Sequence, residues 1–249
     1  MNQKESKTCR NCGETSTGRF CPNCGQRMHV YKITFAETFQ DLADALFAVN
    51  APLLITIKEL IVRPGGLLRN YLNGQRRRYY RPVSFFILTT VLYIIVRSLI
   101  GFDPFRNALI VVEEGPLEGN LLTEARNYMI FNINNFLFIF VFTLAVFSKL
   151  FYFRSYSLAE FLAISFYLLG VYTLLVTCNM FLVQYIGDNM QPLGILIMLI
   201  YFVYAMYSLF KGSYLLVILK SSVLFVLAFL SYAITSFGVS YVIVLLKQS

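Results

Sequence analysis

"RPGGLLRNYLNGQRRRYYRP", residues 63–82, runs directly into the apolar segment "VSFFILTTVLYIIV", residues 83–96. The first of these stretches contains six arginines and three tyrosines in its twenty positions. Basic residues directly before an apolar run are typical of the cytosolic side of a membrane-spanning helix, because Lys and Arg are retained on that side. The junction therefore predicts that a first span begins near Val83 and that the preceding residues lie in the cytosol.

The composition of the whole chain agrees with this prediction. Of its 249 residues, 57% are hydrophobic and 14% are charged, and the mean hydropathy is +0.64. These values are typical of integral membrane proteins and lie outside the range of ordinary soluble domains. The net charge of +8 is concentrated before Val83, where 13 Lys and Arg residues stand against 6 Asp and Glu residues. The excess charge therefore belongs to one face of a membrane protein.

Five apolar runs are long enough to cross a hydrocarbon core of about 30 Å, which takes about 20 helical residues. The predicted spans cover residues 83–102, 134–153, 158–186, 193–210 and 222–246. The breaks between them alternate in charge, beginning with an acidic loop over residues 103–127. By the positive-inside rule, this alternation predicts a multi-pass protein of the cell membrane with its N-terminus in the cytosol and its C-terminus outside.

Composition also divides the chain into three regions. Residues 1–30 are polar and bear four cysteines, residues 31–82 form an amphipathic, Arg-rich juxtamembrane region, and residues 83–249 contain the transmembrane helical bundle. In the middle region, residues 33–50 and 53–62 have apolar side chains at helical spacing. Each of these two amphipathic helices lies either in the membrane interface or packed against the other as a hairpin. The predicted fold is an all-α polytopic membrane protein with a small N-terminal ribbon.

The segment "CRNCGETSTGRFCPNCG", residues 9–25, contains two Cys-x-x-Cys-Gly units. Four thiolates in two such turns are a tetrahedral ligand set for one Zn²⁺ ion, and the glycine after each pair permits a tight turn. We therefore predict a minimal zinc ribbon, with iron or a redox dithiol pair as the alternatives. Because four cysteines fill the coordination shell, the zinc is expected to be structural. The predicted ligands are Cys9, Cys12, Cys21 and Cys24.

The remaining histidine and cysteine are expected to have no chemical role. His29, the only histidine, is interpreted as a solvated linker residue, and Cys178 as a packing residue of the third span. The predicted spans have no close pair of carboxylates, and the chain has no glycine-rich phosphate loop. The sequence therefore predicts no catalytic residue and favours a protein that is not an enzyme.

Three interpretations of the arginine-rich stretch are open. The first is a topology signal that orients the first span. The second is binding of anionic lipid head groups or of a phosphate-bearing ligand at the cytosolic face, since arginine pairs with phosphate through two parallel hydrogen bonds. The third, binding of nucleic acid, is disfavoured because the first span begins directly after Pro82 and leaves little room for a duplex. The candidate lipid- or phosphate-binding residues are Arg63, Arg69, Arg76, Arg77, Arg78 and Arg81.

The stretch has more internal structure than a topology signal needs. Pro64 and Gly65 are expected to break a helix, Gly74 to end the next one, and Pro82 to open the first span. Together with the cysteine pairs, this string resembles a bacterial membrane-protein family of the type called domain of unknown function 3667. The resemblance covers residues 9–95 and implies a bacterial inner-membrane location and a fold class, but no activity. The matching residues are the four cysteines and Arg63, Pro64, Gly65, Arg69, Tyr71, Leu72, Gly74, Arg76, Tyr79 and Pro82.

Two function classes remain after these exclusions. The first is an adaptor or membrane-organising protein, in which the zinc ribbon recruits a cytosolic protein and the arginines contact membrane lipids. Five spans behind a cytosolic region are similar in architecture to the Yip family of membrane-shaping proteins. The second class is a small-molecule or ion transporter or channel component. Few ionisable groups lie inside the predicted spans, where transport chemistry usually places them, so the adaptor is favoured.

Overall fold

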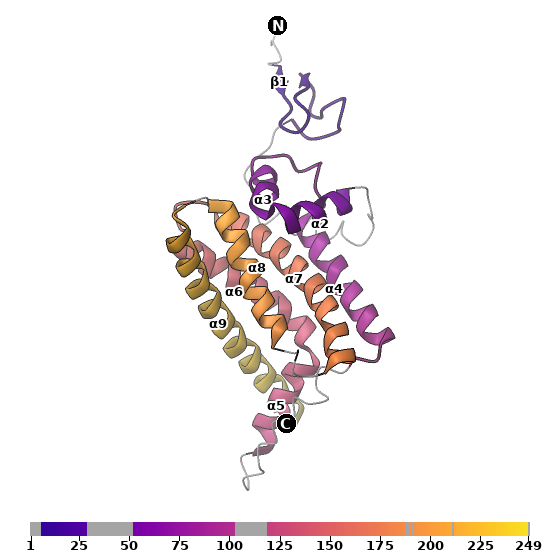
Figure 1. Cartoon of the computed structure of the whole chain (residues 1–249), viewed down its shortest axis with the longest axis vertical. Coiled ribbons are helices and arrows are strands. Elements are labelled where there is room, and N and C mark those ends of the chain that lie inside the picture. Colours follow the sequence, from indigo (N-terminus) through magenta and orange to yellow (C-terminus); the bar gives the residue numbers. More distant parts are fainter. Residues whose placement is uncertain are drawn as a thin grey trace.

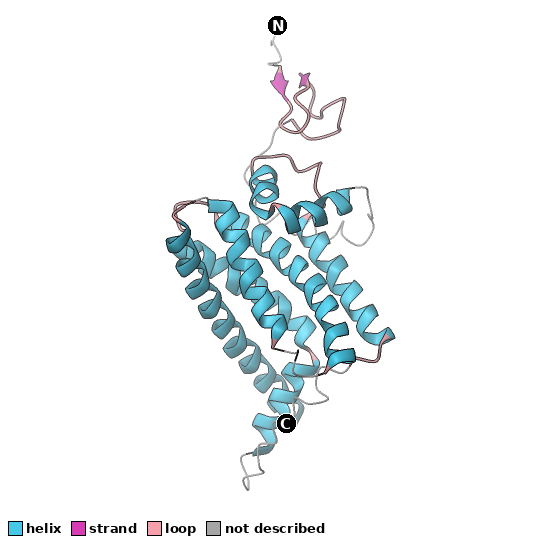
Figure 2. Ribbon diagram, in the orientation of Figure 1, coloured by secondary structure: helices cyan, strands magenta, loops and turns pink. Residues whose placement is uncertain are grey.

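The computed structural model describes residues 6–28, 52–102, 119–187, 190, 192–210 and 212–248. Within these residues lie a two-stranded antiparallel sheet and eight helices (Figures 1 and 2). The strands are β1 (Lys7–Thr8) and β2 (Thr15–Ser16). The helices are α2 (Pro52–Val62), α3 (Pro64–Leu72), α4 (Pro82–Leu99), α5 (Gly119–Phe131), α6 (Ile133–Phe151), α7 (Leu158–Ile186), α8 (Leu193–Phe210) and α9 (Tyr214–Gln248). The predicted all-α fold class is confirmed.

Four of the helices, α4, α7, α8 and α9, are each long and apolar enough to cross a membrane. Helices α5 and α6 together count as a fifth candidate, because they form one apolar pair that bends by 86°. The helices lie side by side in a single bundle (Figure 1). The described part of the chain is thus a multi-pass membrane protein with four to five candidate spans.

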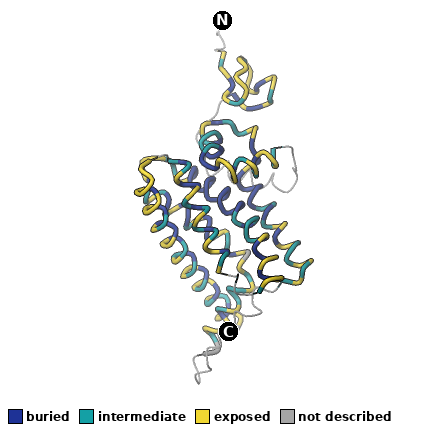
Figure 3. The backbone as a smooth tube through the Cα atoms, viewed as in Figure 1, coloured by how far each residue is buried: buried dark blue, intermediate teal, exposed yellow. Residues whose placement is uncertain are grey.

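Helix α7 occupies the centre of the bundle, where it contacts α4, α6 and α8. Of its most apolar stretch 72% is buried, against 28% for α9 at the edge of the bundle. Figure 3 shows the same gradient from buried to exposed residues. Helix α7 begins with a capping box, in which the Ser157 side chain accepts from the Glu160 N–H and the Glu160 carboxylate accepts from the Ser157 N–H. This cap gives the buried acid Glu160 a partner at the helix start.

Two elements differ from their sequence-based predictions. Helix α9 begins at Tyr214, before the predicted start at residue 222, and includes Lys220. The Lys220 ammonium lies 4.5 Å from the centroid of the Tyr152 ring, and this cation–π contact makes a charge tolerable within the helix. Helix α5 lies where the sequence predicted a loop. The prediction was wrong because the segment contains many polar residues, although one of its faces packs along α9.

Helices α2 and α3 lie across the end of the bundle that faces the ribbon (Figure 1). Helix α2 matches the predicted helix over residues 53–62, and Pro64 and Pro82 occupy the first turns of α3 and α4. Gly65, however, lies inside α3 and does not form the break. The other predicted amphipathic helix, residues 33–50, and His29 lie outside the described residues.

Candidate metal centre and arginine-rich face

The two Cys-x-x-Cys-Gly units fold into two turns of the same geometry. In the first turn, the Cys9 N–H donates to the Glu14 carbonyl at 2.8 Å and the Gly13 N–H donates to the Cys9 carbonyl at 2.9 Å. The second turn repeats both bonds, from Cys21 to Gln26 at 2.7 Å and from Gly25 to Cys21 at 2.9 Å. Both glycines have positive φ angles, 80° for Gly13 and 69° for Gly25, which other residues adopt at a cost. Each turn therefore needs its glycine.

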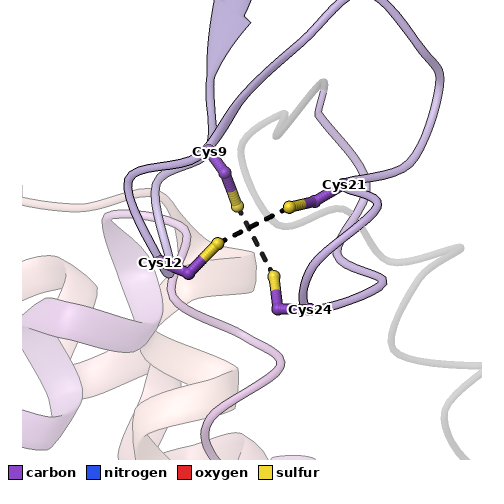
Figure 4. A group of neighbouring side chains, drawn as sticks. All are labelled: Cys9, Cys12, Cys21 and Cys24. Atoms are coloured by element: carbon purple, nitrogen blue, oxygen red, sulfur yellow. Dashed lines mark hydrogen bonds between the residues drawn. The ribbon is translucent and has the colours of Figure 1, made fainter.

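The four sulfurs point toward one centre (Figure 4). They lie within 4.8 Å of one another, with Sγ to Sγ distances of 3.6 Å from Cys9 to Cys24 and 3.5 Å from Cys12 to Cys21. Four sulfurs in a tetrahedron at about 2.3 Å from a zinc ion lie about 3.8 Å apart. The cluster therefore has the size and the donor set to hold one tetrahedral metal ion.

The thiols of the cluster do not titrate as independent groups. Burial raises the pKa of Cys24, but hydrogen bonds from the Gln26 backbone and the Asn11 side chain outweigh burial and lower this pKa to about 7. The Glu14 backbone lowers the pKa of Cys12, but burial and the three neighbouring sulfurs outweigh it and raise this pKa to about 12. A thiolate at one position thus disfavours thiolates at the others. A cation at the centre removes this repulsion, because metal ligation requires the deprotonated form.

The ribbon is hydrogen-bonded to the turn that follows α3. The buried Gln26 side chain donates to the Gly74 carbonyl at 2.5 Å and accepts from the Arg77 N–H at 3.4 Å. On the other Cys-x-x-Cys turn, the Arg10 guanidinium donates to the Asn73 carbonyl at 3.3 Å. Both Cys-x-x-Cys turns therefore contact the arginine-rich stretch directly.

The first part of that stretch fixes α3 to the end of α8. The Arg69 guanidinium donates to the carbonyls of Ser208 at 2.5 Å and Leu209 at 2.7 Å. These carbonyls belong to the last turn of α8, where a helix has no partners of its own and carries partial negative charge. Gly65 lies beside them, and its N–H donates to the Ser208 hydroxyl at 3.1 Å. Arg69 thus caps α8 from a position 139 residues earlier in the chain.

The second part binds α2 through a small polar network. The Glu59 carboxylate accepts from Arg78 at 2.8 Å and from the Tyr79 hydroxyl at 2.9 Å, and the Asn70 amide donates to the same hydroxyl at 3.1 Å. Burial raises the pKa of Tyr79, so its hydroxyl stays protonated and able to donate. The network ties the arginine-rich stretch to α2.

Tyr80 continues the stretch into the core. Its N–H donates to the Thr56 hydroxyl at 2.9 Å, and its carbonyl accepts from the Tyr167 hydroxyl of α7 at 2.5 Å. The Tyr167 ring also meets the Tyr71 ring edge to face, with centroids 5.4 Å apart. The tyrosines between the arginines are therefore packing and hydrogen-bonding residues that seat the stretch on the bundle.

The six candidate arginines do not form one uniform patch. Arg63 is the N-cap residue of α3, and Arg69 lies on α3 beside the end of α8, whereas Arg76, Arg77 and Arg78 lie in the turn beneath the ribbon. Arg81 occupies the N-cap position of α4. The structure thus separates a group next to the membrane helices from a group next to the cysteines.

Three residues of this region were missed by the sequence analysis. Glu59 is the only acid between Asp44 and Asp103, and its isolation beside many arginines is a signal that could have identified it. Gln26 and Ser208 carry no such signal, because their partners are set by long-range packing.

One comparison with known proteins finds a match. Residues 52–94 match the model of a family described as Protein of unknown function (DUF3667), a range that runs from the start of α2 into α4 and excludes the four cysteines. No curated protein and no solved structure matches the chain. The match confirms the resemblance predicted from the arginine-rich string. Residues 52–94 are therefore similar to the DUF3667 family of proteins of unknown function, and the match covers less than half of the chain.

Proposed function

We propose that this protein is a membrane adaptor, in which a zinc ribbon presents a binding surface to a cytosolic protein and the arginine-rich stretch binds anionic lipid or phosphate at the inner membrane face. The observation that carries the proposal is the hydrogen bonding of the ribbon to the arginine turn through Gln26 and Arg10. A flexible tether would leave the two modules independent. Direct contact instead makes the ribbon and the arginine face one unit.

Zinc is the proposed metal because four thiolates at tetrahedral spacing are its preferred structural ligand set. When bound, zinc would link the two Cys-x-x-Cys turns and stabilise a ribbon whose buried apolar cluster is small, with Met28 against the cysteines. The Phe20 side chain lies exposed on the same ribbon. An exposed aromatic residue on a rigid support is a common anchor for a protein partner.

The proposed orientation places the ribbon end of the bundle in the cytosol. Lys149 lies in the last turn of α6 and Arg154 lies just after it, in the connection whose Tyr156 is close to Arg69 of the arginine-rich stretch. Both are basic residues close to an apolar helix, the distribution that the positive-inside rule requires for the cytosolic face. Anionic lipids enriched in that leaflet are then within reach of the arginines.

A transporter remains the second candidate, favoured by polar side chains inside the central helix. The Asn179 Oδ1 atom is buried on α7 without a hydrogen bond in the described part of the chain. Thr173 and Thr177, by contrast, donate to carbonyls of α7 itself, to Gly170 at 2.8 Å and Thr173 at 2.7 Å. Because both hydroxyl protons are used in hydrogen bonds within α7, neither hydroxyl has a proton left to donate to a substrate. These two residues therefore support the adaptor over the transporter.

Native mass spectrometry of the detergent-purified protein tests both parts of the proposal. We expect one zinc per chain, lost in Cys12→Ser and kept in the matched control Cys178→Ser, whose cysteine lies on α7. We also expect retained anionic lipid to decrease when Arg76, Arg77 and Arg78 are changed together to glutamine. The proposal would be contradicted if the chain carries no zinc under reducing conditions. It would also be contradicted if no arginine substitution changes the amount of retained anionic lipid.

A further inference from the structure

A half-open pocket of about 390 Å³, which we call the cavity, lies between α3 and α8, apart from the cysteine cluster. Its lining consists of Arg63, Gly66, Arg69, Tyr207 and Ser208. The volume lies within the range of small-ligand sites, which begins at about 300 Å³. Two guanidinium groups line it and no carboxylate does. Its chemistry is therefore that of a site for an anion.

We propose that this cavity binds the phosphate group of an anionic membrane lipid, so that Arg63 and Arg69 form the lipid-reading part of the protein. The inference rests on the proposed function, which assigns lipid or phosphate binding to the arginine-rich stretch as a whole. It narrows that assignment to one cavity and separates it from the group beneath the ribbon.

The two arginines have complementary roles in the cavity. Arg69 is held in place by the carbonyls of Ser208 and Leu209, so its guanidinium is fixed before a ligand arrives. Arg63 is exposed, and among the described residues its guanidinium has no ion-pair or hydrogen-bond partner. A fixed donor and an available one can grip the oxygens of a phosphate from two sides.

The surroundings of the cavity favour a lipid over a soluble ligand. Ile61 and Val62, at the end of α2, are exposed apolar residues directly before Arg63. On α8, Tyr204 and Tyr207 are also exposed, and the Tyr204 hydroxyl donates to the Val62 carbonyl at 2.7 Å. Tyrosines with apolar neighbours are typical of the membrane interface, where acyl chains lie next to polar groups. A phosphate in the cavity would therefore have room for its lipid tails along these residues.

The charge of the cavity also sets the type of head group. A choline or ethanolamine cation has no carboxylate to pair with among the lining residues, and two guanidinium groups repel it. We therefore expect phosphatidylglycerol, which carries a net negative charge, to bind in preference to phosphatidylcholine.

The test compares binding of these two lipids to the full-length, zinc-loaded protein by native mass spectrometry titration. Arg63→Gln removes the available charge, and we expect phosphatidylglycerol binding to weaken about fivefold, the effect of one basic residue near a membrane surface. Gly66→Leu keeps every charge but fills the cavity, and it should weaken binding at least as much. A Cβ atom at Gly66 meets only the Arg63 Cβ at 3.7 Å, so the backbone leaves room for a side chain at this position.

Arg154→Gln serves as the matched control, because Arg154 is an exposed arginine near the end of α6 and does not line the cavity. Loss of binding in Arg63→Gln and Gly66→Leu with unchanged binding in Arg154→Gln would support the proposal. Equal effects of all three variants, or none, would overturn it. Arg69 is not used alone, because its substitution would also remove the cap of α8.

Two further outcomes separate this inference from others. Inorganic phosphate that binds the detergent-purified protein through Arg63, with no preference between the two lipids, would assign the cavity to a soluble phosphate and overturn the lipid proposal. Weaker lipid binding only in the variant with Arg76, Arg77 and Arg78 changed to glutamine would overturn the cavity assignment and leave the proposed function standing.

Discussion

At Gly65 the backbones of α3 and α8 approach each other more closely than any side chain would allow. A Cβ atom at this position would lie 2.1 Å from both the carbonyl carbon and the carbonyl oxygen of Ser208. These are backbone atoms, which cannot rotate away as a side chain can. Arg69 needs this approach, because it reaches the same carbonyls one helical turn later. The glycine thus permits the arginine to cap α8.

We therefore predict that Gly65→Ala destabilises the protein, by the upper part of the about 1–3 kcal/mol that overpacking of a tight contact costs. Gly66→Ala is the matched control, because its Cβ would meet only the Arg63 Cβ at 3.7 Å. The control should gain about 0.5–1 kcal/mol from the better helix propensity of alanine. Thermal unfolding in detergent, followed by circular dichroism, measures both. Equal melting temperatures for the two variants would contradict the close-approach argument.

Among the elements, α4 and α7 also pack closely at a glycine, Gly170 of α7. A Cβ atom at Gly170 would lie 2.5 Å from Cδ1 and 2.7 Å from Cε1 of the fully buried Phe85 ring, and 3.4 Å from the Phe86 Cα. Small residues let helices in membranes pack closely, because association there depends on van der Waals contact. The first predicted span is therefore locked onto the central one at this glycine.

Substitution of Gly170 by alanine should push the Phe85 ring out of its site and lower stability by about 1–3 kcal/mol. The control is Gly238→Ala on α9, where a Cβ atom would meet nothing within 4 Å. Denaturant-induced unfolding in mixed detergent micelles compares the two. If Gly238→Ala loses as much stability as Gly170→Ala, the close contact of Gly170 with Phe85 does not explain the loss.

The ribbon is an element whose stability is expected to depend on its metal. Removal of the metal with a chelator should unfold both Cys-x-x-Cys turns and release Gln26 from Gly74, while α7 stays folded. Hydrogen–deuterium exchange should then rise over residues 9–28 and over the arginine turn at residues 73–77. Gln26→Ala is expected to keep the metal yet raise exchange at residues 73–77 alone. If chelation leaves hydrogen–deuterium exchange at residues 73–77 unchanged, the ribbon does not stabilise that turn.

At the scale of the whole molecule, charge is distributed toward one end of the bundle. The arginine-rich stretch joins α2 and α3 to α4 at this end, and the ribbon projects from it (Figure 1). Lys149 lies in the last turn of α6 and donates to the Tyr156 carbonyl at 2.8 Å, and Arg154 lies between α6 and α7. An odd number of spans then carries the C-terminus to the opposite side of the membrane. This number holds if the bent pair α5 and α6 crosses once.

This arrangement predicts that a reporter fused to the N-terminus stays in the cytosol and that one fused after residue 249 is exported. Fluorescent-protein and alkaline-phosphatase fusions measure the two locations, because each is active on only one side of the membrane. Changing Arg76, Arg77 and Arg78 together to glutamine tests the topology-signal interpretation, which requires a mixed orientation in this variant. Both termini on the same side would show that α5 and α6 do not form a single span.

The sequence by itself determined the features that depend on local pattern. Apolar runs of helical length predicted the helices that correspond to α4, α6, α7 and α8, since a segment in a membrane must satisfy its own backbone. The spacing of the cysteines predicted the cluster, because each Cys-x-x-Cys-Gly turn forms from neighbouring residues. The arginine-rich string predicted the similarity to the DUF3667 family over residues 52–94. In each case the residues that interact lie close together in the chain.

Only the tertiary structure decided which distant residues meet. It placed Arg69 on the end of α8, Gln26 on the arginine turn and Lys220 on the Tyr152 ring, and it divided six arginines into two groups. It also turned a polar loop into α5, by giving that segment a face on α9. The physical reason is that helix ends and buried charges take whichever partners the packing brings near, and the packing joins segments that are far apart in the chain.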